Sequence, residues 1–213
     1  MKTHSILTII LVAIVICGLS NSSLAGREGL KGNQAGGEEK LSLSQTEANT
    51  LKFMREEEKL ARDVYLVMFT YWSSKTFINI AESEQTHMDA IKTLLDKYAL
   101  PDPADSEIGV FNDTELQQLY DDLVDLGGNS MLDALMVGAL IEEVDIEDLQ
   151  TAIDQTDKQD LERVYGNLMG GSKNHLRAFV SQIELISGEN YEAQHLSQEE
   201  VDAILDPQGE VNN

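Results

Sequence analysis

From Ser44 onward, apolar residues recur at intervals of three and four, and no stretch alternates polar and apolar residues as a half-buried strand does. This periodicity predicts an all-α fold. The long helices are expected at residues 44–70, 76–98, 131–155 and 158–187, with a short helix at 114–126. Ser44 and Glu47 form a capping box at the first helix, Asn112 is the expected cap of the short helix, and Ser197 with Glu200 begins a last small helix.

The connections between these helices restrict the topology further. "TYWSSKT" and "TDK" are short links, whereas "LPDPADSEIGVFND" contains two of the three prolines and precedes the short helix that Gly127 and Gly128 end. A short link, a long crossover and a second short link are the connectivity of a ferritin-like four-helix bundle. We therefore predict that fold for residues 44–190, with the short extra helix on the crossover and a small helix and tail at 191–213.

The N-terminal segment has the layout of a secretory signal peptide. Lys2 precedes an apolar run at residues 6–19, and the small-residue site Ser23-Leu24-Ala25 follows it. We predict a signal peptide at 1–25, a flexible polar leader at 26–43, and a secreted or periplasmic protein. The alternative is an uncleaved N-terminal anchor, although the run is short for a membrane span.

Composition excludes several functions for the exported chain. The single cysteine, Cys17, lies in the signal segment, so the mature chain has no disulfide, thiolate metal site or cysteine nucleophile. A net charge of −23 repels nucleic acid and attracts cations. We expect no nucleic-acid partner and no stable membrane span after cleavage.

Four ionisable residues stand where core leucines are expected. Glu58, Glu84, Glu142 and His175 are each flanked at helical spacing by apolar residues, and His87 lies one turn beyond Glu84 on the same face. An unpaired buried charge is costly, so one such residue on every long helix indicates a shared site. Their distances from the connecting turns also agree. The midpoint of Glu142 and His175 falls in "TDK". That of Glu58 and Glu84 falls at the start of "TYWSSKT", which agrees if the first helix ends near Thr70 and is one turn out of step if it continues to Ser74.

Other acids near these positions are expected on the solvated faces of the helices. They are Glu56, Glu57, Glu82, Glu143 and Glu147.

Carboxylate and imidazole ligands without thiolate suit iron or manganese. The pattern thus predicts a di-metal site rich in carboxylates, most simply di-iron, with manganese as the alternative.

Two segments resemble those of rubrerythrin-type proteins: "EKLARDVY" resembles their first-helix motif and "AESEQTHM" their second-helix Glu-x-x-His segment. Together with "LIEEVDIEDL" and "GSKNHLRAF", they resemble an uncharacterised ferritin-like domain family of bacteria and archaea over about residues 44 to 190. The resemblance implies a ferritin-like fold, but no established activity.

The resemblance also implies roles for individual residues. Glu58 would be the first-helix ligand, Glu84 the bridging carboxylate and His87 its neighbouring imidazole. Glu142 and Asp145 stand in place of a Glu-x-x-Glu pair on the third long helix. On the fourth, Ser172 and His175 replace Glu-x-x-His, so one bridging carboxylate is missing. Asp145 or Glu143 compensates for it, or one ion binds tightly and one weakly.

Three functions are consistent with these observations. The first is an exported metalloprotein that handles iron with O2 or peroxide, in which Tyr65 is a hydrogen-bond donor, a redox tyrosine or a core residue. The second is a metal carrier or sensor without turnover, and the third is a metal-free structural or interaction bundle. The sequence leaves enzymatic activity undecided and is compatible with a homodimer.

Overall fold

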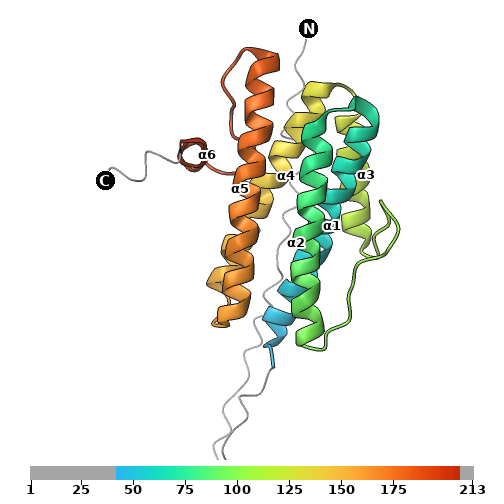
Figure 1. The fold of residues 1–213 in the computed structure, drawn as a ribbon, viewed down its shortest axis with the longest axis vertical. Helices are drawn as coiled ribbons and strands as arrows, with labels where there is room; N and C mark the ends of the chain where they lie inside the picture. Colours follow the sequence, from blue (N-terminus) through green and yellow to red (C-terminus); the bar gives the residue numbers. More distant parts are fainter. Residues whose placement is uncertain (1–41, 207–213) are drawn as a thin grey trace, which may run out of the picture. The chain divides into compact units, whose positions relative to one another are not determined.

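A computed structural model describes residues 42–206, which form helices and no strand (Figure 1). The helices are α1 (Gln45–Trp72), α2 (Lys75–Lys97), α3 (Thr114–Gly127), α4 (Met131–Asp154), α5 (Gln159–Ser187) and α6 (Gln198–Leu205). The all-α prediction is confirmed, and each predicted helix is present with ends shifted by no more than a few residues. The predicted signal peptide and nearly all of the predicted leader lie outside the described residues.

The four long helices pack side by side as two antiparallel pairs, α1 with α2 and α4 with α5. Contacts between α1 and α4 and between α2 and α5 join the pairs, and α3 packs on α1 and α4. One cluster of the core takes Leu51, Ile91, Leu149 and Leu161 from the four long helices, all with no exposed surface. At the end of α5, by contrast, Leu185 and Ile186 are 77% and 48% exposed.

The capping boxes of Ser44 with Glu47 and of Ser197 with Glu200 are both present. The expected cap at Asn112 is wrong by one position. The Asp113 side chain accepts hydrogen bonds from the backbone N–H groups of the next helical residues, whereas Asn112 donates to the carbonyl of Pro103. Asp113 directly precedes the first helical turn, so its carboxylate also lies nearer the positive end of the helix dipole.

A buried ion pair ties the crossover between α2 and α3 to α1. Lys59 and Asp63 pair one turn apart with fully buried side chains. The Lys59 ammonium donates to the Glu107 carbonyl, and the backbone N–H of Gly109 donates to Asp63. The crossover therefore covers this face of α1 and satisfies two charges that the solvent cannot reach.

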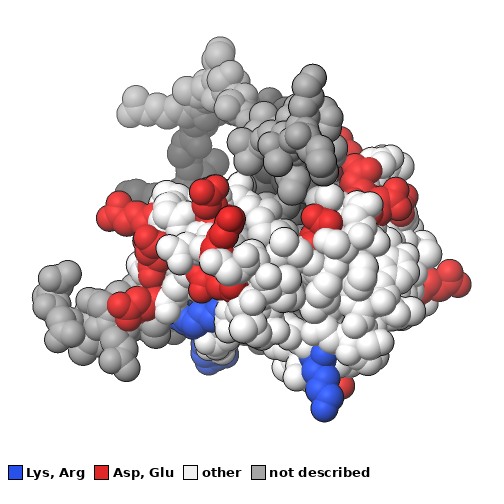
Figure 2. Space-filling view, turned by 90° about the horizontal axis from the view of Figure 1, so that it is seen from above, with Lys and Arg blue, Asp and Glu red and all other residues white. Residues whose placement is uncertain are grey.

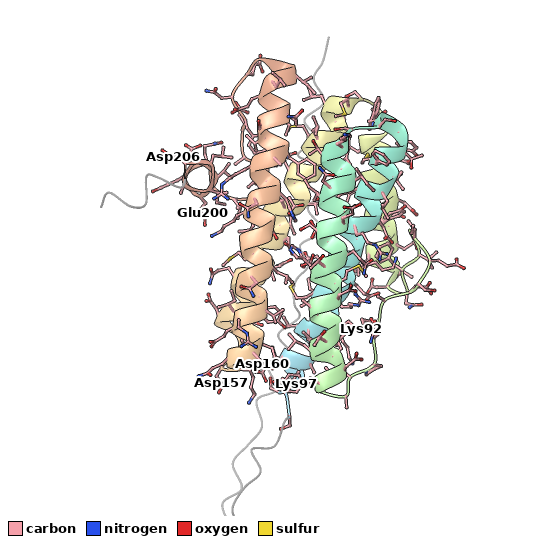
Figure 3. The ribbon with its side chains drawn as sticks, viewed as in Figure 1. Lys92, Lys97, Asp157, Asp160, Glu200 and Asp206 are labelled. Atoms are coloured by element: carbon pink, nitrogen blue, oxygen red, sulfur yellow. The ribbon has the colours of Figure 1, made fainter. Side chains whose placement is uncertain are left out.

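No helix within residues 42–206 is long and apolar enough to cross a membrane. Acidic side chains outnumber basic ones on the face seen in Figure 2, in keeping with 38 Asp and Glu against 15 Lys and Arg. One ion pair, between Lys97 and Asp160, joins the end of α2 to the start of α5 (Figure 3).

Candidate metal centre

The bundle brings five of the six predicted ligands to one level in its interior. Glu58 comes from α1, Glu84 and His87 from α2, Glu142 from α4 and His175 from α5, and each is at most 8% exposed. The helical periodicity explains this arrangement, because each side chain replaces an apolar residue in the stripe that faces the other helices. We call these five residues the candidate metal centre.

Two overlapping groups of ligand atoms make up the centre. Glu58, Glu84 and His87 form one group and Glu84, Glu142 and His175 the other, with the ligand atoms of each group within 4.8 Å of one another. His87 Nδ1 lies 2.7 Å from one oxygen of Glu84, and His175 Nδ1 lies 2.8 Å from the other oxygen. Glu84 therefore presents one oxygen to each group, as a bridging carboxylate does.

Several polar atoms of the centre are buried without a hydrogen-bond partner. They are one oxygen of Glu58, one of Glu84 and Nδ1 of His175. Glu84 Oε1 and His175 Nδ1 are close to each other but are not oriented for a hydrogen bond. Buried polar atoms are almost always paired. Atoms that converge without a hydrogen bond fit a cation, which would satisfy all of them at once.

The charges of the centre shift the pKa of each member. Burial lowers the pKa of His87, but hydrogen bonding to Glu58 and the nearby charge of Glu84 outweigh burial and raise it to about 11. Burial also lowers the pKa of His175, but the nearby charges of Glu142 and Glu84 outweigh it and raise this pKa to about 10. Burial raises the pKa of Glu84, yet the two histidines lower it to about 2. Burial and the charge of Glu84 raise the pKa of Glu142 to about 7. The raised pKa values favour imidazolium forms of His87 and His175, which offset the carboxylate charges around them.

The sixth predicted ligand, Asp145, belongs to neither group of converging atoms. It is buried on α4, and one of its oxygens accepts a hydrogen bond from the Ser172 hydroxyl of α5. Burial and the charge of Glu142 raise its pKa to about 8. Ser172, which stands where the resemblance implied a glutamate, therefore holds Asp145 beside the centre and adds no charge of its own.

Neighbouring groups fix the ligands in place. The Tyr65 hydroxyl donates to Glu142 over 2.6 Å, which accounts for Tyr65 as a hydrogen-bond donor. Nε2 of His175 lies 2.9 Å from the Ser83 hydroxyl, which leaves Nδ1 directed at the carboxylates. Partners of this kind orient metal ligands in proteins.

Two acids that were expected on solvated faces are buried. Glu143 has no exposed surface, and its carboxylate accepts hydrogen bonds from the Tyr191 hydroxyl and from backbone N–H groups of residues 194–196. Glu57 is 7% exposed, on the side of α1 that faces α4. The prediction was wrong because helical periodicity identifies one apolar stripe and cannot show that a second face is also covered. No signal in the sequence marks this second face.

The fold and the five converging side chains define an all-helical protein with a buried carboxylate and histidine cluster. The chain belongs to the DUF2202 family of uncharacterized protein domains, whose sequence model matches residues 47–208. It is 52% identical over 167 residues to the uncharacterized protein MJ0754 of Methanocaldococcus jannaschii. The aligned residues make up 78% of this chain and 90% of that protein. The crystal structure of hypothetical protein MJ0754 from Methanococcus jannaschii is similar, with a TM-score of 0.74 and 48% identity over 84% of this chain and 97% of that one.

Proposed function

We propose that the protein is an exported, ferritin-like four-helix bundle that binds two iron ions and handles iron with O2 or peroxide. One observation carries the proposal: Glu84 is shared between two groups that each hold a further carboxylate and an imidazole. Carboxylate and imidazole donors suit iron and manganese, and paired ions need a bridging carboxylate to offset their repulsion.

In the proposed centre, Glu58 and His87 would hold one ion, Glu142 and His175 would hold the other, and Glu84 would serve both. Bound iron would supply the electrons that reduce O2 or peroxide. The chain's own residues would keep the centre in place: Tyr65 orients Glu142, and Ser83 fixes the ring of His175. Bound ions would displace the protons that the raised pKa values of Asp145 and Glu142 favour. Asp145 would then add a fourth negative charge beside the three carboxylates, which together would match the charge of two divalent ions.

The decisive experiment is an anaerobic titration of the purified mature protein with Fe(II), followed by exposure to O2. We expect two Fe(II) per chain, and oxygen uptake in proportion to the bound iron. Absence of iron binding by the wild type, or binding that is unchanged in Glu84→Ala, would contradict the proposal.

A specific observation favours a second candidate, a metal carrier or sensor without turnover. Ser172 leaves the centre with a single bridging carboxylate, since its hydroxyl is hydrogen-bonded to Asp145. The same titration distinguishes the two functions, because a carrier would bind Fe(II) and take up no stoichiometric oxygen. The export proposal rests on the N-terminal sequence, and the intact mass of protein from the cell exterior would test cleavage near Gly26.

A further inference from the structure

Four carboxyl groups on α1 and α4 lead from the candidate metal centre to the surface. We call Asp145, Glu57, Asp148 and Glu147 the carboxylate line. At its inner end, the charge of Asp145 acts on both Glu58 of the centre and Glu57. One oxygen of Asp145 is buried and has no hydrogen-bond partner.

Glu57 occupies the middle of the line. One of its oxygens is also buried without a partner. Its carboxyl group donates a hydrogen bond to Asp148 of α4. The two unpartnered oxygens therefore belong to successive carboxyl groups between the centre and Asp148.

The outer end of the line reaches solvent on α4. Asp148 is partly buried, and the charges of Glu147 and His195 act on it. His195 Nε2 lies 2.6 Å from a Glu147 oxygen, and these side chains are 37% and 58% exposed. Two carboxylates and an imidazole thus gather at the surface, all of them donor types for a divalent cation.

No Lys or Arg within residues 42–206 forms an ion pair with Glu57, Asp145 or Asp148. For stability alone, apolar side chains would serve the contact between α1 and α4 at least as well as unpaired acids. A helix interface that keeps acids without cationic partners is explained if a mobile cation is the partner.

We propose that the carboxylate line is the route by which divalent cations pass from the α4 surface to the candidate metal centre. Glu147, Asp148 and His195 would capture the hydrated ion. Glu57 and Asp145 would then offer oxygen ligands in turn on the way to Glu58. This inference rests on the proposed metal-binding function.

Stopped-flow loading with Co(II) tests the route, because the visible absorption of protein-bound Co(II) reports arrival at the buried centre. The variants are Asp148→Asn and Glu57→Gln. The matched control is Asp157→Asn, which removes the same charge from a side chain that is 93% exposed at the α4–α5 turn (Figure 3). We expect each line variant to load about tenfold more slowly, the scale of electrostatic effects on association rates, with unchanged stoichiometry and final spectrum. The control should load at the wild-type rate.

The outcomes separate the route from the function. If the wild type binds Co(II) and both line variants load as fast as the control, the route is wrong and the centre stands. If the variants lose affinity at equilibrium in proportion to the rate, Asp148 and Glu57 are part of the binding site, and the route is again wrong. If the wild type shows no Co(II) band, the proposed function fails and the route fails with it. If Glu57→Gln folds poorly, the loading rate of Asp148→Asn alone tests the route, because Asp148 is only partly buried and its substitution should leave the fold intact.

Discussion

The ring of His87 on α2 occupies the space that a side chain at Gly171 on α5 would fill. A Cβ built on Gly171 would lie 2.5 Å from Nε2 of His87. The ring has little freedom to move away, because its other nitrogen contacts Glu58 and Glu84. The glycine therefore allows the close approach of α2 and α5 that places the imidazole in the centre.

Gly171→Ala should consequently displace His87 and weaken metal binding. Changes to groups that orient a metal ligand typically cost 10- to 100-fold in affinity, and we expect an effect on that scale. Gly170→Ala is the matched control, since a Cβ there meets nothing within 4 Å. It should leave metal affinity unchanged and raise the free energy of unfolding by up to about 1 kcal/mol through helix propensity. Calorimetric titration of both variants with Mn(II) makes the measurement, and equal affinities would refute the steric role of Gly171.

Metal should stabilise the fold through Glu84. At a free Fe(II) or Mn(II) concentration 100 times Kd, binding adds about 2.7 kcal/mol to the free energy of unfolding. For a chain of this size, that corresponds to a rise of about 5–10 °C in Tm. Glu84→Ala removes the carboxylate that both ligand groups share and should abolish the rise, whereas Glu82→Gln, an exposed acid on the same helix, should retain it. Thermal scans with and without metal measure the difference. An equal rise in Glu84→Ala would mean that the ions bind surface acids.

The metal-free protein should lose stability as the pH rises from 5 to 9. The folded state raises the pKa of Glu142 to about 7 and of Asp145 to about 8, mainly through burial. A group whose pKa is higher in the folded state than in the unfolded state stabilises the fold at pH values below its unfolded pKa. This stabilisation is lost as the pH rises to the folded pKa. His87 and His175 act in the same direction above about pH 6.5, since their folded pKa values are about 11 and 10.

The chelated protein should therefore show a falling Tm across this window. Asp145→Asn should flatten the fall below pH 8, and the exposed control Asp157→Asn should not. Metal binding displaces protons from the ligands, so the increase in Tm on adding Mn(II) should grow with pH. A Tm of the chelated wild type that rises from pH 5 to 9 would contradict the assigned shifts.

The sequence was sufficient for the helices and for the convergence of Glu58, Glu84 and Glu142, because a charged residue in an otherwise apolar stripe is visible without a structure. It was insufficient for acids whose burial depends on segments without regular periodicity. Glu143 is covered by the link between α5 and α6. Asp63 is covered by the α2–α3 crossover, in which the backbone N–H of Gly109 donates a hydrogen bond to the Asp63 carboxylate. A backbone donor of this kind leaves no pattern of side chains in the sequence.

The buried ion pair between Lys59 and Asp63 supports a final prediction about stability. Asp63→Asn leaves the Lys59 ammonium without a carboxylate in a place where neither side chain has exposed surface. Removal of one partner of a buried pair typically costs about 3–5 kcal/mol, and we expect a loss of that size in the free energy of unfolding.

The matched control for this loss is Asp96→Asn, which breaks the exposed Lys92–Asp96 pair of α2, with the same spacing of one turn. Lys92 is labelled in Figure 3. Its side chains are 44% and 66% exposed, so the cost should be only about 0.3–0.5 kcal/mol. Urea denaturation of both variants measures these costs, and hydrogen exchange should show faster opening of residues 105–111 in Asp63→Asn alone. Equal losses in the two variants would mean that the crossover is held by its other contacts and that the Lys59–Asp63 pair contributes little to it.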